Sequence, residues 1–264
     1  EMSASLVGSE MCIRDRDIGG IEEAVAKAFP NRDFKRAFTS YIIMERLEKN
    51  KGIKVNDLPA TLKELKKAGY KDILVQPTHL LHGEEYEHKV LTTVDKFKGD
   101  FDRIVVSDPL MVGKNDFAIA ASAVATQFPT LGKGEGVVLM GHGSPRDNNQ
   151  SFGNTYKMLQ ETFDKMGLPV VVGTVEEVDT PNVDEVLEQI KARGYKTVHM
   201  FPLMIVAGDH ANNDMYGDEE DSWKSMIEKM GVKTVGHLQG IGRNAAVQAI
   251  YVQHAVAAEA GVQR

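Results

Sequence analysis

The sequence predicts an α/β protein built of two similar lobes, each a parallel sheet flanked by helices. Three observations lead to this prediction. From residue 17 onward, helical patterns alternate with short β-branched runs, the order typical of βαβ units. One segment of the chain recurs in a related form 125 residues further along. A polar stretch with two glycines at residues 129–135 (PTLGKGE) lies between a predicted helix and a predicted strand, and it marks the seam between the lobes.

The predicted elements follow one another along the chain in this alternating order. Helices are predicted where apolar residues recur at helical spacing, over residues 21–29, 58–68, 115–127, 183–193, 222–230 and 245–258. Strands are predicted where short runs are rich in β-branched residues, over residues 34–39, 72–76, 103–106, 137–140, 170–174, 197–201 and 233–237. Most of these strands are almost wholly apolar, as strands buried on both faces of a parallel sheet are.

The internal repeat gives the two lobes their predicted bounds. Residues 66–77 (KKAGYKDILVQP) align without gaps with residues 191–202 (KARGYKTVHMFP), including a Gly-Tyr-Lys turn and the final proline. The same register places Gly83-Glu84-Glu85 on Gly208-Asp209-His210, so polar groups follow a strand in both halves. We expect an N-terminal lobe over 17–130, a C-terminal lobe over 131–264 that carries the metal site, and chemistry between the lobes.

The first sixteen residues need separate treatment. Residues 1–16 show neither strand alternation nor an amphipathic stripe, and the run from residue 5 to 16 (SLVGSEMCIRDR) resembles translated sequencing-adapter read-through. We therefore treat 1–16 as a non-native, adapter-like segment. It contains Cys12, the single cysteine of the chain. Without Cys12 no disulfide, cysteine-ligated zinc or iron–sulfur cluster is expected, so any metal would bind histidine and carboxylate.

Composition excludes several classes of protein. With 264 residues, 42% hydrophobic and 26% charged, the chain has the composition of a soluble globular protein. The net charge of −7 disfavours nucleic acid as a partner. No stretch approaches the roughly 18–20 consecutive apolar residues that a membrane-spanning helix needs. No signal peptide is evident. We therefore expect a cytoplasmic protein with no membrane or nucleic-acid partner.

Three polar residues stand directly after predicted strands of the second lobe. They are His142, between two glycines that let the backbone turn, and Glu176 and His210. Ligands of open α/β sheets bind beyond the carboxyl ends of the strands, so these side chains are expected to converge at one rim. Two imidazoles and a carboxylate suit a borderline divalent metal. Imidazole can also accept a proton near neutral pH, so one residue type could serve as ligand and base.

Each of these residues also has a purely structural interpretation. A Gly-His-Gly turn often carries a structural histidine, and Glu176 alone fits a solvated loop carboxylate. His210 and Asp214 have the spacing that shares one helix face, but this spacing arises often by chance. The acidic residues 218–221 would complement a helix dipole. Four further histidines are interpreted as structural: His199 lies in a predicted buried strand, and no pattern supports a role for His88, His237 or His254.

At these residues the sequence resembles the anaerobic-pathway sirohydrochlorin cobaltochelatases, class II tetrapyrrole chelatases related to ferrochelatase. The resemblance covers essentially residue 17 to the C-terminus. Its most specific stretch is PLMIVAGDHANNDMYGDEED at residues 202–221. Shorter stretches also carry it, namely RAFTS at 36–40, QPTH at 76–79, GEEY at 83–86, MGHG at 140–143, GTVE at 173–176 and GIGRN at 240–244.

The resemblance implies a fold, a reaction and a set of site residues. It implies two flavodoxin-like lobes with an active-site cleft between them. It implies that Co²⁺ enters sirohydrochlorin and two protons leave, in anaerobic cobalamin biosynthesis, without a nucleotide or redox cofactor. His142, His210 and Glu85 match catalytic residues of the family, Glu85 as an acidic residue that faces the cleft from the first lobe. His142, Glu176 and His210 match its metal ligands.

The sequence departs from the family in two places. The family opens with an apolar strand and a Ser-Phe-Gly-Thr-Ser-like turn, whose place residues 1–16 occupy here. We therefore expect a first-lobe sheet that lacks this strand and has an uncovered edge. Many relatives carry further histidines after the Gly-His-Gly turn, where this chain has SPRDNN at 144–149. That difference weakens any inference of this chain's metal preference from that of its relatives.

Several alternatives stay open at this point. Fe²⁺ or Ni²⁺ could be inserted into the same macrocycle, because histidine and carboxylate accept all three metals. A non-catalytic protein that binds metal or tetrapyrrole would use the same residues. A hydrolase is disfavoured, because Gly141-His-Gly-Ser144 lacks the Gly-x-Ser-x-Gly pattern. A homo-oligomer remains open. The eight carboxylates of sirohydrochlorin need local cations, for which Arg146 and Lys114 are candidates.

Overall fold

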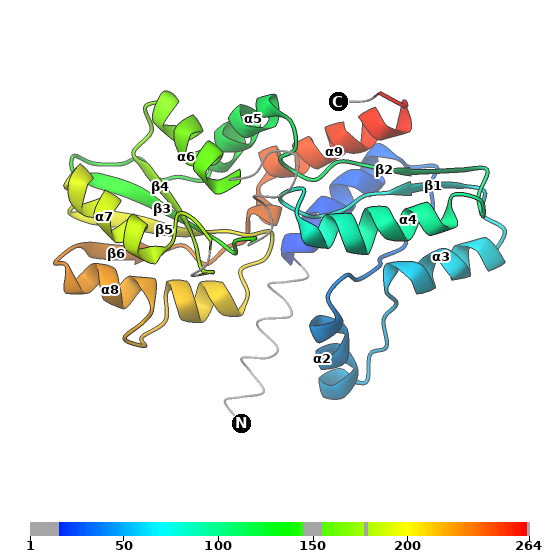
Figure 1. The fold of residues 1–264 in the computed structure, drawn as a ribbon, viewed down its shortest axis with the longest axis horizontal. Coiled ribbons are helices and arrows are strands. Elements are labelled where there is room, and N and C mark those ends of the chain that lie inside the picture. The colour runs from blue at the N-terminus through cyan, green and yellow to red at the C-terminus, as the bar shows by residue number, and fades with distance from the viewer. Residues whose placement is uncertain (1–15, 145–154, 177–178, 263–264) are drawn as a thin grey trace.

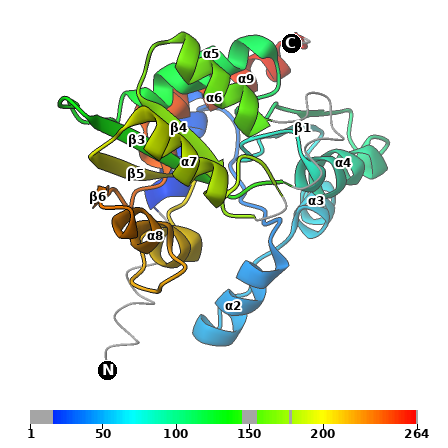
Figure 2. The same ribbon diagram turned by 60° about the vertical axis from the view of Figure 1, so that its left-hand side comes forward.

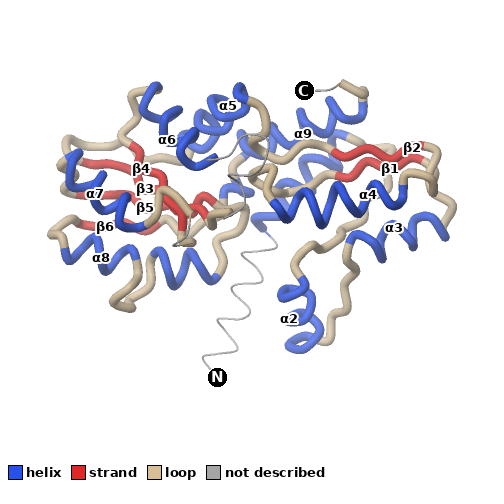
Figure 3. The backbone as a smooth tube through the Cα atoms, viewed as in Figure 1, coloured by secondary structure: helices blue, strands red, loops and turns tan. Residues whose placement is uncertain are grey.

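The computed structural model describes residues 16–144, 155–176 and 179–262. In this part of the chain two parallel sheets lie at opposite ends of an elongated molecule (Figures 1 and 3). The first sheet pairs β1 (Asp72–Val75) with β2 (Arg103–Val106). The second has the order β4-β3-β5-β6. Its strands are β3 (Glu135–Gly141), β4 (Val170–Thr174), β5 (Thr197–Leu203) and β6 (Lys233–Gly236). The predicted two-lobed α/β class with parallel sheets is confirmed.

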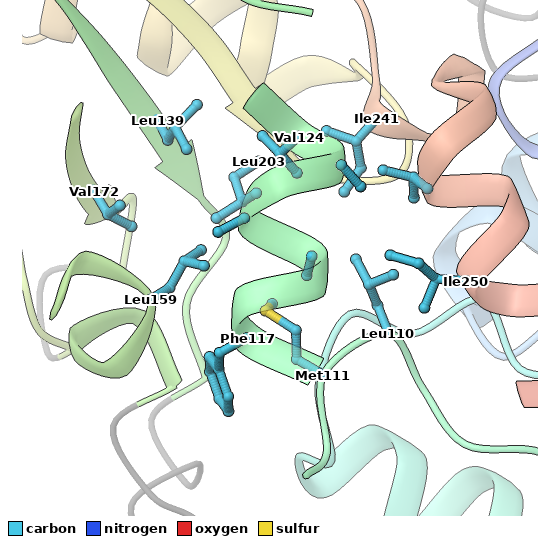
Figure 4. Packing of buried hydrophobic residues seen from close by; sticks show 14 of the residues in the cluster. Leu110, Met111, Phe117, Val124, Leu139, Leu159, Val172, Leu203, Ile241 and Ile250 are labelled. Carbon is cyan, nitrogen blue, oxygen red and sulfur yellow. The ribbon is translucent and has the colours of Figure 1, made fainter. Parts of the chain in front are cut away.

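The second sheet is buried on both faces. Alternate residues of β3 point to opposite sides, so Val137 and Leu139 join one core cluster and Val138 and Met140 the other. The first cluster packs under α5 (Lys114–Ala125), α6 (Thr155–Lys165) and α9 (Ala245–Glu259), as Figure 4 shows for part of it. The second packs under α7 (Val183–Arg193) and α8 (Trp223–Lys229). The strands are apolar because neither face meets water.

The first sheet has its own smaller core. It is covered by α3 (Leu58–Lys67), the π-helix η1 (Tyr86–Leu91) and α4 (Thr92–Phe97). Asp57 caps α3 by accepting a hydrogen bond from the backbone N–H of Ala60 at 2.8 Å. The buried apolar residues of this lobe include Leu62, Ile73, Val90, Val94 and Phe101.

The sequence repeat corresponds to repeated structure. α3 begins at Leu58 and α7 at Val183, β1 at Asp72 and β5 at Thr197. The π-helices η1 and η3 (Ala211–Met215) keep the same offset of 125 residues. The internal repeat is therefore confirmed. Glu85 and His210 are equivalent positions, each directly before a π-helix, and π-turns occur frequently at functional sites.

Three helical segments show how the two halves of the chain are joined. The helix over residues 16–28 and α5 both pack in the core cluster of the second sheet, although they precede the predicted seam. α9 packs in the same cluster, and its far end contacts β1 and β2. The lobe bounds 17–130 and 131–264 stay a prediction. No helix in the described ranges is long and apolar enough to span a membrane.

Some predicted elements differ from the structure. The strand predicted over 34–39 is wrong, because Phe38 makes only an isolated bridge to Asp57 and Phe34 is 49% exposed. In the described residues the first sheet has two strands, and the expected uncovered edge stays a prediction. The helices α2 (Tyr41–Lys51) and α6 were not predicted, nor were η1 and α4. α2 could not be recognised from a buried stripe, since none of its residues is buried. Residues 1–15, which hold most of the adapter-like segment, lie outside the described part.

An ion-pair network ties the end of α9 to the first sheet. Glu259 accepts hydrogen bonds from Arg103 on β2, at 2.9 Å, and from Arg32, at 2.6 Å. Both arginines also pair with Asp72 on β1. The hydrogen bond from Arg103, followed by that from Arg32, holds the pKa of Glu259 below its ordinary value. The network fastens a helix that packs on the second sheet to the sheet of the other lobe.

We expect Glu259→Gln to lower the free energy of unfolding at pH 7 by about 1 kcal/mol or less, because these partly exposed pairs are weakened by water. The pKa of Glu259 is depressed in the folded state, so its contribution is complete above the ordinary value of 4.5 and is lost as the pH falls through the folded-state pKa. Urea unfolding of both proteins at about pH 7 and about pH 3 checks this. An equal difference at both pH values would contradict it.

Candidate functional site

His142 stands in a turn whose shape depends on glycine. A Cβ on Gly141 would lie 2.2 Å from Cε1 of Tyr156, so only glycine fits against this ring. Gly143 has a φ of +97°, a conformation that other residues rarely adopt. Its backbone N–H donates to the Tyr156 hydroxyl at 3.2 Å. The turn therefore ends β3 and leaves the His142 side chain 53% exposed, free to meet a ligand.

His142 and His210 lie together although they are far apart in sequence. Their ring centroids are 4.8 Å apart and the rings are perpendicular. The pairing follows from the topology, because β3 and β5 are parallel neighbours and both histidines come after the carboxyl ends of these strands. His210 Nδ1 and Asp214 Oδ2 are 2.6 Å apart. A donating Nδ1–H leaves the lone pair on Nε2, so Asp214 fixes the orientation of the His210 ring.

Glu176 approaches His142 from the other side of β3. Its Oε1 lies 3.9 Å from Nδ1 of His142. Backbone hydrogen bonds continue past the ends of β3 and β4, from Val175 to Gly141 at 2.9 Å and from Glu176 to His142 at 3.2 Å. The three predicted metal ligands are thus brought to one edge of the sheet. No group of three or more His, Cys, Asp or Glu side chains within the described ranges is already arranged to hold a metal ion.

Glu85 lies in the first lobe and is paired there. Its side chain is 59% exposed and forms an ion pair with Lys89 one turn along η1. His79 Nε2 lies 4.0 Å from its other oxygen, and burial lowers the pKa of His79. The described ion pairs of Glu85 therefore belong to its own lobe, and none of them joins it to His142 or His210.

Two loops bring the lobes into contact beside these residues. A Cβ on Gly83 would lie 2.9 Å from Oγ of Ser144, so the first-lobe loop before Glu85 lies against the turn that carries His142. Lys114 is the first residue of α5. Arg146, the other cation considered for the substrate carboxylates, lies outside the described residues. The predicted site residues thus cluster where the two lobes meet.

Comparison with known proteins identifies the family. A sequence model of the family "Cobalt chelatase (CbiK)" matches residues 9–259 of the chain. The chain belongs to the cobalt chelatase family. The sirohydrochlorin cobaltochelatase of Salmonella typhimurium is 35% identical over 240 residues, which cover 91% of this chain and 88% of that protein. The sirohydrochlorin cobaltochelatase CbiKC of Nitratidesulfovibrio vulgaris is 30% identical over 239 residues, which cover 90% of this chain and 82% of that protein.

Solved structures support the same fold for this cobalt chelatase family member. SirB from Bacillus subtilis with Fe³⁺ superposes with a TM-score of 0.56 at 15% identity, covering 92% of this chain and 88% of SirB. The sirohydrochlorin chelatase SirB from Bacillus subtilis subspecies spizizenii, in complex with cobalt, gives a TM-score of 0.55 at 16% identity, covering 94% and 89%. At these identities the likeness shows the fold.

Two further carboxylates support the site of this chelatase family member. Asp179 is buried, at 5% exposure, and accepts the backbone N–H of Ser144, which fixes the turn after His142. No sequence pattern pointed to it. Asp214 orients His210, and its spacing of four residues from His210 was the available signal. That spacing became informative only once the structure placed His210 directly before η3 and Asp214 within it.

Proposed function

We propose that this protein is a sirohydrochlorin cobaltochelatase, a lyase that inserts Co²⁺ into sirohydrochlorin and releases two protons, in anaerobic cobalamin biosynthesis in the cytoplasm. The observation that carries the proposal is the pair His142 and His210, with ring centroids 4.8 Å apart, in a chain of the cobalt chelatase family. Its small-molecule partners are the tetrapyrrole and the divalent metal, and the reaction uses no nucleotide or redox cofactor.

We assign the first contact with the metal to His142, Glu176 and His210. Neutral imidazoles and one carboxylate bind Co²⁺ at a site that still exchanges its ligands. The three side chains are 40–53% exposed, so an incoming metal and the macrocycle can both reach them. Asp214 keeps Nε2 of His210 available as a lone pair. These features support a site that binds the metal and then releases it to the macrocycle.

Removal of the two pyrrole protons needs bases beside the macrocycle. A histidine nitrogen that binds metal cannot hold a proton at the same time, so each imidazole becomes a proton acceptor as the pyrrole nitrogens replace it at the metal. We assign Glu85 as a carboxylate that faces the macrocycle from the first lobe. The proton balance is then complete, because one Co²⁺ enters, two N–H bonds break and two protons leave through His142, His210 and Glu85 to water.

The test is an anoxic time course of the visible absorption of sirohydrochlorin with limiting protein, run in parallel with Co²⁺, Fe²⁺ and Ni²⁺ and against protein-free controls. We expect many turnovers, fastest with Co²⁺. A faster reaction with Fe²⁺ or Ni²⁺ would change the metal assignment. Tight binding of tetrapyrrole or metal without turnover would contradict the chelatase proposal and support a carrier.

A further inference from the structure

The helix α2 lacks the tertiary packing that ordinarily stabilises a helix. It is capped at both ends, by Ser40 and by Gly52 in the left-handed conformation, yet none of its residues is buried. Tyr41 and Ile42 are 62% and 64% exposed. The helix projects from the first lobe, apart from both sheets (Figures 1 and 2). Since most helical stability in proteins comes from tertiary packing, the placement of α2 needs another explanation.

Polar contacts join α2 to both halves of the predicted site. At its start, the ring of Tyr41 lies 5.9 Å from the ammonium group of Lys89, the ion-pair partner of Glu85. Further along, Nη1 of Arg46 lies 2.8 Å from Oδ2 of Asp209, the residue directly before His210. Five residues of helix span roughly 7.5 Å. α2 therefore lies between the equivalent positions Glu85 and His210 of the two lobes.

Another carboxylate could take the place of Asp209 in its ion pair with Arg46. The two side chains are 52% and 40% exposed, and ion pairs with such exposure contribute little to stability. A guanidinium group binds carboxylates through two parallel hydrogen bonds. The chain carries a net charge of −7, so a polyanionic substrate depends on cations held at the site itself.

We propose that Arg46 is a positioning residue that binds a carboxylate of the tetrapyrrole, with Asp209 occupying its guanidinium until the substrate enters. The inference rests on the proposed function and names a contact that the substrate makes. The substrate carboxylate replaces Asp209, and α2 then holds the macrocycle beside His210 and Glu85. Arg46 does not touch the metal, so it acts on tetrapyrrole binding and not on the insertion step.

The decisive measurement is the dissociation constant of metal-free sirohydrochlorin, titrated by visible absorption without any metal. We expect Arg46→Gln to raise this constant about tenfold, because a charge-assisted hydrogen bond is lost. Asp209→Asn should leave the constant unchanged or lower it, because the competing carboxylate is gone. The matched control Lys51→Gln removes the same charge from the far end of the same helix and should have no effect.

Kinetics separate this role from a purely structural one. For Arg46→Gln the KM for sirohydrochlorin should rise with the dissociation constant, while kcat at saturating tetrapyrrole stays within about twofold. The inference is overturned if Arg46→Gln binds as wild type does, or if Asp209→Asn weakens binding as much as Arg46→Gln, as a structural latch would. If the wild-type protein itself neither binds sirohydrochlorin nor inserts cobalt, the proposed function fails first, and the inference with it.

Discussion

We expect His210→Ala to slow cobalt insertion at least about 100-fold while the protein stays folded. His210 is placed to bind the metal through Nε2 and to accept a pyrrole proton, and alanine can do neither. Of the imidazole pair only His142 would remain, whose ring centroid lies 4.8 Å from that of His210 in the wild-type protein. Because the His210 side chain is 42% exposed, its truncation leaves no large cavity.

The measurement is the initial rate of sirohydrochlorin metallation under anoxic conditions, with thermal unfolding of each variant recorded alongside. His88→Ala is the matched control, since His88 is an exposed histidine on η1 that has no assigned role. It should retain the wild-type rate. A rate for His210→Ala within about tenfold of wild type, in a folded protein, would remove His210 from the proposed mechanism.

The largest stability effect is expected at Asp17. Its side chain is fully buried and forms an ion pair with Arg243. It also accepts the backbone N–H groups of Ala207, at 3.1 Å, and Gly240, at 3.3 Å. The residue thus joins the helix over 16–28 to the loop that leads to His210. Asp17→Ala leaves a partly buried guanidinium and two buried N–H groups without this acceptor.

We expect Asp17→Ala to lower the free energy of unfolding by about 3 kcal/mol, the cost of breaking a buried charge pair by removing one partner. Urea unfolding measures the loss. The control is Glu23→Ala, an exposed carboxylate on the same helix, which should change stability by less than about 0.5 kcal/mol. A loss below about 1 kcal/mol for Asp17→Ala would show that water or neighbouring groups satisfy the donors.

Much of the fold was predictable because burial imposes a pattern on the chain. The strands 137–140 and 170–174 are almost wholly apolar, and the structure places β3 and β4 there with both faces covered. The repeat predicted that a strand followed by polar residues occurs in both halves, and the structure shows helix, strand and π-helix at the same offset. The strand predicted over 34–39 failed because β propensity is expressed only beside a partner strand, and Phe38 has a single bridge.

The convergence of His142, Glu176 and His210 was also predictable, since carboxyl ends of adjacent parallel strands meet at one edge of a sheet. Their roles as ligands and bases remain predictions that the variants above test. Asp179 and Arg46 could not be recognised in the same way. Their partners, Ser144 and Asp209, are 35 and 163 residues away, and no local pattern records such a pairing.

The amino-acid sequence by itself determined the α/β class, the repeated lobe and the three residues that meet after β3, β4 and β5, because these depend on local periodicity and on the rules of parallel sheets. Only the tertiary structure decided that α9 reaches from the second core to the first sheet, that Asp17 is paired with Arg243, and that α2 lies between Glu85 and His210. Such contacts join residues distant in sequence, and they arise from how packed elements happen to meet in space.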